Sequence, residues 1–264
     1  CKLVKARANY RSAQDLVVCD HHLFFRDLWT RQELIEDRKL PLLPDYSMVI
    51  FDEGHKVLLP AALSAGHQIV KEEINDFLSS VETIQGARTS LISAALATQE
   101  ANNRFFKLLY QSATGDAGSN RLAVTKSDEL LQAAATLRRA LDLFELELQN
   151  EQELYMDSLS PTQFQAFEHR VEQAMMALSQ FTRQDTDQFI VWAERKEETF
   201  WIVPRNLNEM LHRHLINKEI PVIFSSATLS TGGDFSYFAR SLGIREFSGS
   251  SVDSPFAYEK QALI

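Results

Sequence analysis

Hydrophobic and polar positions divide the chain into three stretches with different periodicity. Short β-branched and aromatic runs predict strands at 16–19, 48–51, 189–194, 199–204 and 221–224. Between residues 71 and 187, apolar residues instead recur at spacings of three and four, which is typical of amphipathic helices. The order along the chain is therefore α/β, then helical, then α/β.

The helical stretch predicts three main segments. The first runs from about residue 72 to 110 and is one long helix or a pair, and the second covers 127–157. The third starts at the sequence SPTQ, where Ser160 can cap, Pro161 suits the first helical position and Gln163 completes a capping box; it ends near residue 183. Shorter helices are expected at 23–37, from 58 and over 206–217.

This order gives two accounts of the domains. In the simpler one, residues 1–70 and 188–264 form one α/β domain, and 71–187 is an all-helical insertion between its strands. The alternative is two separate domains in series. Neither α/β part looks complete, and a chain running from Cys1 to QALI is expected to be a piece of a longer protein.

Composition narrows the function classes. The 264 residues carry a net charge of −9, so nucleic-acid binding would need a local basic surface. The best candidate is the segment 2–11, which has no acidic residue and contains Lys2, Lys5, Arg7 and Arg11. A weaker set comprises Arg195, Lys196, Arg205 and Arg213. No apolar run approaches a membrane span, and two cysteines make no disulfide framework, so a cytoplasmic protein is expected.

The sequence VIFDEGH, residues 49–55, carries the first candidate chemistry. Ligands of parallel sheets bind beyond the carboxyl ends of the strands. Asp52 at that position can hold Mg²⁺ through water, and Glu53 can orient or deprotonate a water that attacks a γ-phosphate. His55 could sense the phosphate. The other interpretation is that Asp52 and Glu53 only cap the following helix.

The sequence FSSATLS, residues 224–230, is the second candidate. It also follows an apolar run, and Ser226 and Thr228, with Ala227 between them, could reach His55. Such a contact would couple phosphate chemistry to domain movement. A generic loop rich in serine and threonine is the alternative.

Together these segments resemble motifs II and III of superfamily-two helicases. The stretch CKLVKARANYRSAQDLVVCDHHLFF is similar to one found in DinG- and XPD-like helicases, and VDSPFAY resembles their junction between motor domains. Asp20 stands where that family usually has Asn. The resemblance spans nearly the whole chain.

The resemblance implies an incomplete RecA-like parallel sheet with a helical arch domain as the insertion. It further implies a DEAH-box, ATP- and Mg²⁺-dependent helicase that moves 5′ to 3′ on single-stranded or forked DNA and acts as a monomer. Asp52 would bind Mg²⁺, Glu53 would activate water, and His55 with Ser226 and Thr228 would couple hydrolysis to movement. Cys1 fits the last ligand of a 4Fe–4S cluster of the parent protein. His21 joins the basic segment as a DNA contact.

Two alternatives stay open. The sequence contains no G-x-x-x-x-G-K-[ST] loop, so this chain alone is not expected to hydrolyse ATP. It could instead be a non-catalytic interaction module on a degenerate scaffold, binding a partner through its acidic insertion. A two-metal nuclease using Asp52 and Glu53 is disfavoured, because no further carboxylate cluster follows the strand pattern.

Trp192 and Trp201 could stack on bases, although core packing is the simpler interpretation.

Overall fold

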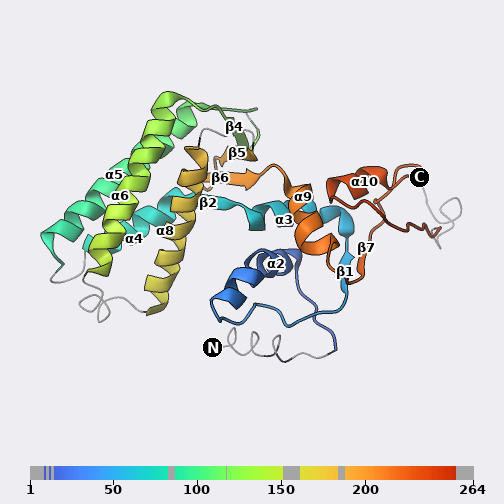
Figure 1. Cartoon of the computed structure of the whole chain (residues 1–264). Helices are drawn as coiled ribbons and strands as arrows, with labels where there is room; N and C mark the ends of the chain where they lie inside the picture. Colours follow the sequence, from blue (N-terminus) through green and yellow to red (C-terminus); the bar gives the residue numbers. More distant parts are fainter. Residues whose placement is uncertain are drawn as a thin grey trace, which may run out of the picture. The chain divides into compact units, whose positions relative to one another are not determined.

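The computed structural model describes residues 9, 12, 15–82, 87–116, 118–150, 161–183 and 188–253. The chain forms two compact units. The first unit comprises 1–61 and 207–264, and the second unit comprises 62–206. Figure 1 shows both with their elements labelled. None of the described helices has the length and apolar composition needed to cross a lipid bilayer.

A pair of parallel strands lies at the centre of the first unit. Strand β1 (Val49–Asp52) pairs with β7 (Val222–Ser225) in the register Val49↔Val222 to Asp52↔Ser225. Around them lie α2 (His21–Glu36), η1 (Gly54–Lys56), α3 (Leu58–Ala65), α9 (Leu207–Leu211), the π-helical η3 (His212–Ile216) and α10 (Ser236–Ser241).

Aromatic stacking builds the core of the first unit. The Phe51 ring lies between those of Phe25 and Phe224, with centroids 5.7 and 5.0 Å away and nearly parallel planes. Phe25 comes from α2, so these contacts pack that helix on one face of the strand pair. On the other face, the cross-strand partners Ile50 and Ile223 are 62% and 45% exposed. The described residues therefore cover only one face, whereas the sequence favoured a strand buried on both.

A buried ion pair fixes the segment between α2 and β1. Asp27 is fully buried; one of its carboxylate oxygens accepts a hydrogen bond from the Leu43 amide at 2.9 Å, and the other pairs with Arg31 at 2.8 Å. The Arg31 guanidinium also donates to the carbonyls of Leu43 and Pro44 and to the Asp45 carboxylate. These bonds hold the segment against α2 just before β1 begins.

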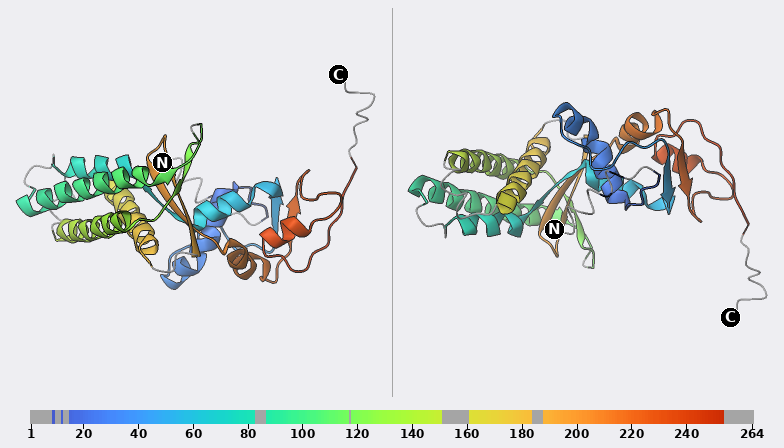
Figure 2. Two further views of the ribbon diagram at one scale, coloured as in Figure 1. Left: turned by 90° about the horizontal axis from the view of Figure 1, so that it is seen from above. Right: turned by 90° about the horizontal axis from the view of Figure 1, so that it is seen from below.

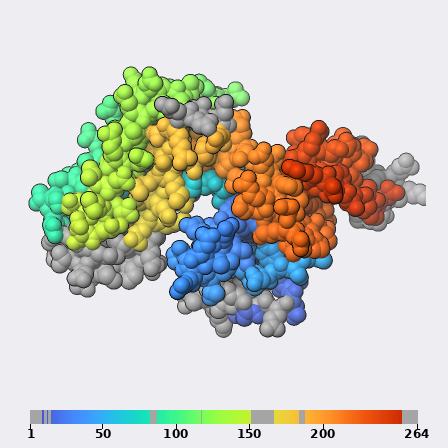
Figure 3. Space-filling view, viewed as in Figure 1, coloured from blue at the N-terminus to red at the C-terminus, as the bar shows by residue number. Residues whose placement is uncertain are grey.

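The described part of the second unit combines long helices with an antiparallel sheet. The helices are α4 (Lys71–Glu82), α5 (Thr89–Gln111), α6 (Asp128–Gln149) and α8 (Pro161–Phe181). The sheet has the order β2-β6-β5-β4-β3, made of His67–Val70, Thr199–Pro204, Phe189–Glu194, Arg121–Val124 and Ala113–Thr114. Figure 2 shows the sheet at one end of the helices, and in Figure 3 α6 and α8 form adjacent ridges of one surface.

The apolar faces of these helices form one core with the inner face of the sheet. Phe105 from α5, Phe181 from α8 and Phe200 from β6 are fully buried, and their rings meet edge to face. Ser127 caps α6 by accepting a hydrogen bond from the Leu130 amide. The second unit thus has a hydrophobic core of its own.

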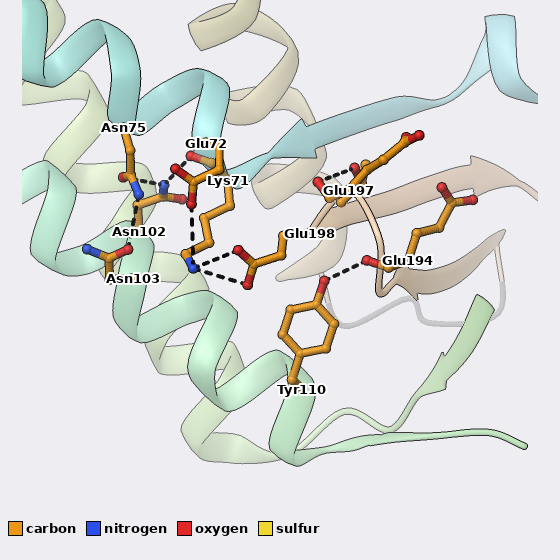
Figure 4. A network of polar contacts seen from close by, with 10 residues as sticks. Lys71, Glu72, Asn75, Asn102, Asn103, Tyr110, Glu194, Glu197 and Glu198 are labelled. Atoms are coloured by element: carbon orange, nitrogen blue, oxygen red, sulfur yellow. Dashed lines mark hydrogen bonds and ion pairs between the residues drawn. The ribbon is translucent and has the colours of Figure 1, made fainter. Parts of the chain in front are cut away.

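A polar network joins α4, α5 and the β5–β6 hairpin (Figure 4). The Lys71 ammonium lies 2.9 and 3.1 Å from the two carboxylate oxygens of Glu198. The Tyr110 hydroxyl donates to the Glu194 carbonyl at 2.7 Å. Burial, followed by the nearby charges of Glu198 and Glu194, raises the pKa of Tyr110 to about 12. At neutral pH the phenol therefore stays protonated and keeps donating.

Several sequence expectations need correction. The predicted insertion is not all-helical, because β3 and β4 lie within 71–187. The two units also divide the chain at 61/62 and 206/207 rather than at 70/71 and 187/188, because in the second unit β6 pairs antiparallel with β2 and β5 with β4. The parallel sheet shown is the pair β1–β7, so the fold is mixed α/β with one parallel and one antiparallel sheet.

The strand expected at 16–19 is also wrong. Residues 16–20 are irregular, and Leu16 and Val18 are 78% and 75% exposed. A β-branched run shows that a segment can be extended, but pairing depends on partners that periodicity does not reveal. The helices expected at 23–37 and from 58 are confirmed as α2 and α3. The helical residues expected at 72–110 form the pair α4 and α5.

The buried pair makes a testable prediction about stability. We expect Asp27→Ala to lower the free energy of unfolding of the first unit by about 3 kcal/mol, because it leaves Arg31 without its buried partner. Urea unfolding can be followed through Trp29 emission in a background where Trp192 and Trp201 are replaced by Phe. Asp37→Ala is the control, since Asp37 pairs with Lys39 at an exposed site. Equal effects of the two substitutions would contradict the assigned role of Asp27.

A second prediction concerns pH. Because the pKa of Tyr110 is raised from 10.0 to about 12, its contribution to stability is complete below pH 10 and is lost as pH rises through about 12. The stability advantage of the protein over Tyr110→Phe should shrink by on the order of 1 kcal/mol across that range, allowing for solvent screening. Unfolding at successive pH values, with the exposed Tyr237→Phe as control, measures this difference. An advantage that stays constant would contradict the prediction.

Candidate functional site

The parallel pairing brings the two candidate motifs to one edge of the sheet. Asp52, the last residue of β1, lies opposite Ser225, the last residue of β7. The residues that follow each strand, Glu53–His55 and Ser226–Thr228, therefore leave the sheet side by side. Carboxyl ends of parallel strands are where α/β proteins place their ligands.

A short hydrogen bond links the motifs. His55 Nδ1 lies 2.7 Å from Ser226 Oγ, across 171 positions of sequence. Ser226 Oγ also accepts a bond from the Thr228 amide at 3.3 Å, and the two hydroxyl oxygens are 3.5 Å apart. His55 Nδ1 is in turn 3.2 Å from a carboxylate oxygen of Glu53. The imidazole therefore lies between the acidic residue of one motif and the hydroxyl of the other.

The backbone after β1 turns sharply. Glu53 adopts a left-handed conformation with φ 51° and ψ 46°, and its amide is bonded to an Asp52 carboxylate oxygen at 3.0 Å. A Cβ atom on Gly54 would lie 3.1 Å from the Phe224 Cβ, so the backbone passes close to β7 there. This turn leaves the side chains of Asp52 and Glu53 exposed at the sheet edge.

His21 lies at the same edge. Its Nε2 is 3.1 Å from the Asp52 carbonyl oxygen, and its ring meets Phe51 edge to face at 5.7 Å. Sequence reasoning placed His21 among DNA contacts, but the structure shows it bonded to the strand that carries Asp52. The preceding Asp20 caps α2 by accepting the Leu23 amide at 2.7 Å. An Asn side chain can make the same cap, so the departure from the usual family residue preserves this bond.

The donor atoms at the edge suit a hard cation. Carboxylate oxygens of Asp52 and Glu53 and the hydroxyls of Ser226 and Thr228 are ligands or water partners that Mg²⁺ prefers. Within the described ranges, no group of three or more His, Cys, Asp or Glu side chains could hold a metal ion directly. Two carboxylates beside two hydroxyls fit a magnesium ion that keeps most of its water ligands.

The remaining candidates from the sequence lie outside the described residues or away from this edge. Cys1, Lys2, Lys5, Arg7 and Arg11 lie outside the described residues, so the structure says nothing of their predicted roles. Cys19 is half-buried, and burial raises the pKa of its thiol, which suits the packing role expected for it. The ring of His214 packs edge-on against Trp29.

Sequence reasoning named Trp192 and Trp201 as possible base-stacking residues but missed that they form one group with Arg121. Trp192 and Trp201 are partly exposed and stack on each other on the antiparallel sheet, with Arg121 beside them. Core packing was the favoured interpretation for both tryptophans. The two tryptophans occupy strand-like segments that follow each other in the sequence, and this could have indicated that they lie side by side. The pairing of β5 with β6, which makes them cross-strand partners, was not foreseen.

The parallel strand pair thus carries an acidic edge and a histidine–serine bridge, and comparisons with known proteins show which sequences share these segments. The whole chain aligns at 36% identity over 268 residues with a probable ATP-dependent helicase, YpvA, of Bacillus subtilis. It also aligns over its whole length with the ATP-dependent DNA helicase YoaA of Haemophilus influenzae, at 25% identity, and of Escherichia coli, at 27%.

The alignments cover only part of these relatives. The chain spans 40% of the length of each of the three helicases. A solved structure of an XPD helicase aligns with 83% of this chain and with 33% of the helicase chain. The two share 14% sequence identity, and the TM-score is 0.40. No protein-family model matches the sequence. The similarity to a segment of ATP-dependent helicases confirms the resemblance found in the sequence.

Proposed function

We propose that this chain is part of an ATP-driven DNA helicase and supplies half of its hydrolytic site. The observation that carries the proposal is the 2.7 Å contact between His55 and Ser226, which joins the two motifs across the ends of β1 and β7. The helicase relatives support the same class of reaction. The exposed Ile50 and Ile223 fit a motor domain of which this chain forms a part.

In this proposal each residue at the exposed edge has its own role. Magnesium, when bound with ATP, would neutralise charge on the phosphates, and Asp52 would hold it through water. Glu53 would orient the attacking water and accept its proton. His55, which lies between Glu53 and Ser226, would transmit the state of the phosphate to β7 and Thr228. His21 would position β1 through its bond to the Asp52 carbonyl.

The finer features of the proposal follow from the family resemblance. The motor would move 5′ to 3′ on single-stranded or forked DNA as a cytoplasmic monomer, with the second unit acting as the arch. Cys1 would be an iron–sulfur ligand of the full-length protein, and Lys2, Lys5, Arg7 and Arg11 would contact DNA. The 264-residue chain alone should show no ATPase activity, because it has no phosphate-binding loop.

The water-activating role of Glu53 is tested in the full-length protein. We expect Glu53→Gln to lower the DNA-stimulated kcat for ATP hydrolysis by roughly 10²- to 10⁴-fold, because the amide cannot accept a proton. ATP binding should persist, since the substitution preserves shape. Glu33→Gln, on the exposed side of α2, is the matched control. Undiminished ATP turnover in Glu53→Gln would contradict the proposed role of Glu53. A full-length protein without ATPase activity would favour the non-catalytic interaction module.

The bridge between motifs is tested by a double-mutant cycle. His55→Ala and Ser226→Ala should each reduce unwinding more than ATP hydrolysis, because each breaks the link between β1 and β7. Since both remove the same contact, the double variant should be little worse than either single variant. Strand-displacement and ATPase rates measured on the same preparations give the comparison. Fully additive losses of unwinding would show that the two residues act independently.

A further inference from the structure

An aromatic pair lies on the outer face of the antiparallel sheet in the second unit. Trp192 of β5 and Trp201 of β6 are direct cross-strand partners. Their ring centroids are 5.7 Å apart with planes only 12° from parallel, and both side chains are partly exposed. On the same face, Ile190 is 44% exposed and Gln68, opposite Trp201, is also exposed. This part of the sheet is open to solvent.

A guanidinium extends the pair into a column. Arg121 of β4 lies 5.3 Å from the Trp192 ring centre, and its side chain is 52% exposed. We name Arg121, Trp192 and Trp201 the aromatic column. Flat, delocalised groups from three adjacent strands thus line up across the sheet, with Trp192 between the other two. The faces on which another flat group can stack are therefore those at the two ends of the column, on Arg121 and Trp201.

One carboxylate holds the column in place. Glu194 Oε1 accepts the Trp192 Nε1 hydrogen at 3.2 Å and lies 3.3 Å from Arg121 Nε. The Glu194 carbonyl accepts the Tyr110 hydroxyl from α5, which ties this end of β5 to the helices (Figure 4). The Glu194 side chain is 14% exposed, so its charge is largely covered and paired. The rings are therefore ordered before any ligand binds.

Two further cations flank the column. The amides of Arg195 and Lys196 donate to Asn120, the residue before Arg121, so the β5–β6 turn lies beside the start of β4. Both side chains are exposed. Glu198 is paired with Lys71 and Arg121 with Glu194, which leaves Arg195 and Lys196 against the exposed Glu197, an excess of one positive charge. The surroundings are locally basic in a chain of net charge −9.

We propose that the aromatic column binds single-stranded DNA by stacking on its bases, while Arg121, Arg195 and Lys196 contact the phosphates. The inference rests on the proposed helicase function, which supplies single-stranded DNA as the ligand. Unpaired bases have free faces for aromatic side chains, and such stacking tolerates any sequence. A translocating motor needs contacts of that kind. The role is distinct from the packing role that a cross-strand tryptophan pair has by itself.

The experiment measures binding of an oligo-dT strand to the full-length protein. Stacking should quench tryptophan emission, and Trp29→Phe, in the first unit, should leave that quenching intact. Trp192→Leu and Trp201→Leu should each weaken binding about tenfold, whereas Trp201→Phe should retain most of it. Arg121→Ala should lower both affinity and its dependence on salt, and Arg121→Lys should lower affinity while keeping the salt dependence. Circular dichroism checks that each variant is folded.

The possible results separate the two proposals. Folded Trp192→Leu and Trp201→Leu proteins that bind oligo-dT like the unaltered protein, with DNA-stimulated ATPase retained, would overturn the aromatic column and leave the helicase proposal standing. A protein that neither binds oligo-dT nor hydrolyses ATP would overturn both. Weaker binding in the leucine variants with intact DNA-independent ATPase activity would support the column as a DNA contact.

Discussion

The candidate site depends on the pairing of β1 with β7. These strands are separated by most of the chain, yet their in-register pairing sets Asp52 opposite Ser225. Shifting β7 by one residue would turn Phe224 away from the Phe51 ring and would move Ser226 relative to His55. The hydrophobic stack and the polar bridge therefore require the same register, and each reinforces the other.

The long segment between these strands does not disturb their pairing, because most of it folds around a core of its own. Residues 62–206 bury their apolar helix faces against the inner side of their own sheet. Closing a long loop costs little more entropy than closing a short one, so a large insertion between two paired strands is tolerable. The insertion can then carry surfaces of its own, such as the aromatic column, without altering the edge formed by Asp52 and Ser225.

Sequence reasoning succeeded where one local signal decided the structure. The spacing of Leu130, Leu137 and Phe144 specifies a helix with one buried face, and all three are fully buried. It failed where structure depended on partners. The LVVC run is irregular, and β5 and β6 were assigned to the wrong sheet, because strand patterns do not say which strands pair or in which direction. The motifs after β1 and β7 could be recognised from residue types, but the contact of His55 with Ser226 needed the parallel register.

The same limit explains why the column of Arg121, Trp192 and Trp201 was missed. Each residue alone has an ordinary structural explanation, and only the order β6-β5-β4 places the three side by side. Glu194 then fixes the arrangement, because its side chain orients Arg121 and Trp192 and its carbonyl oxygen accepts a hydrogen bond from the Tyr110 hydroxyl. A packing pair would need neither the exposed guanidinium nor this carboxylate. Their presence at an open sheet face is what separates a prepared binding surface from ordinary cross-strand contact.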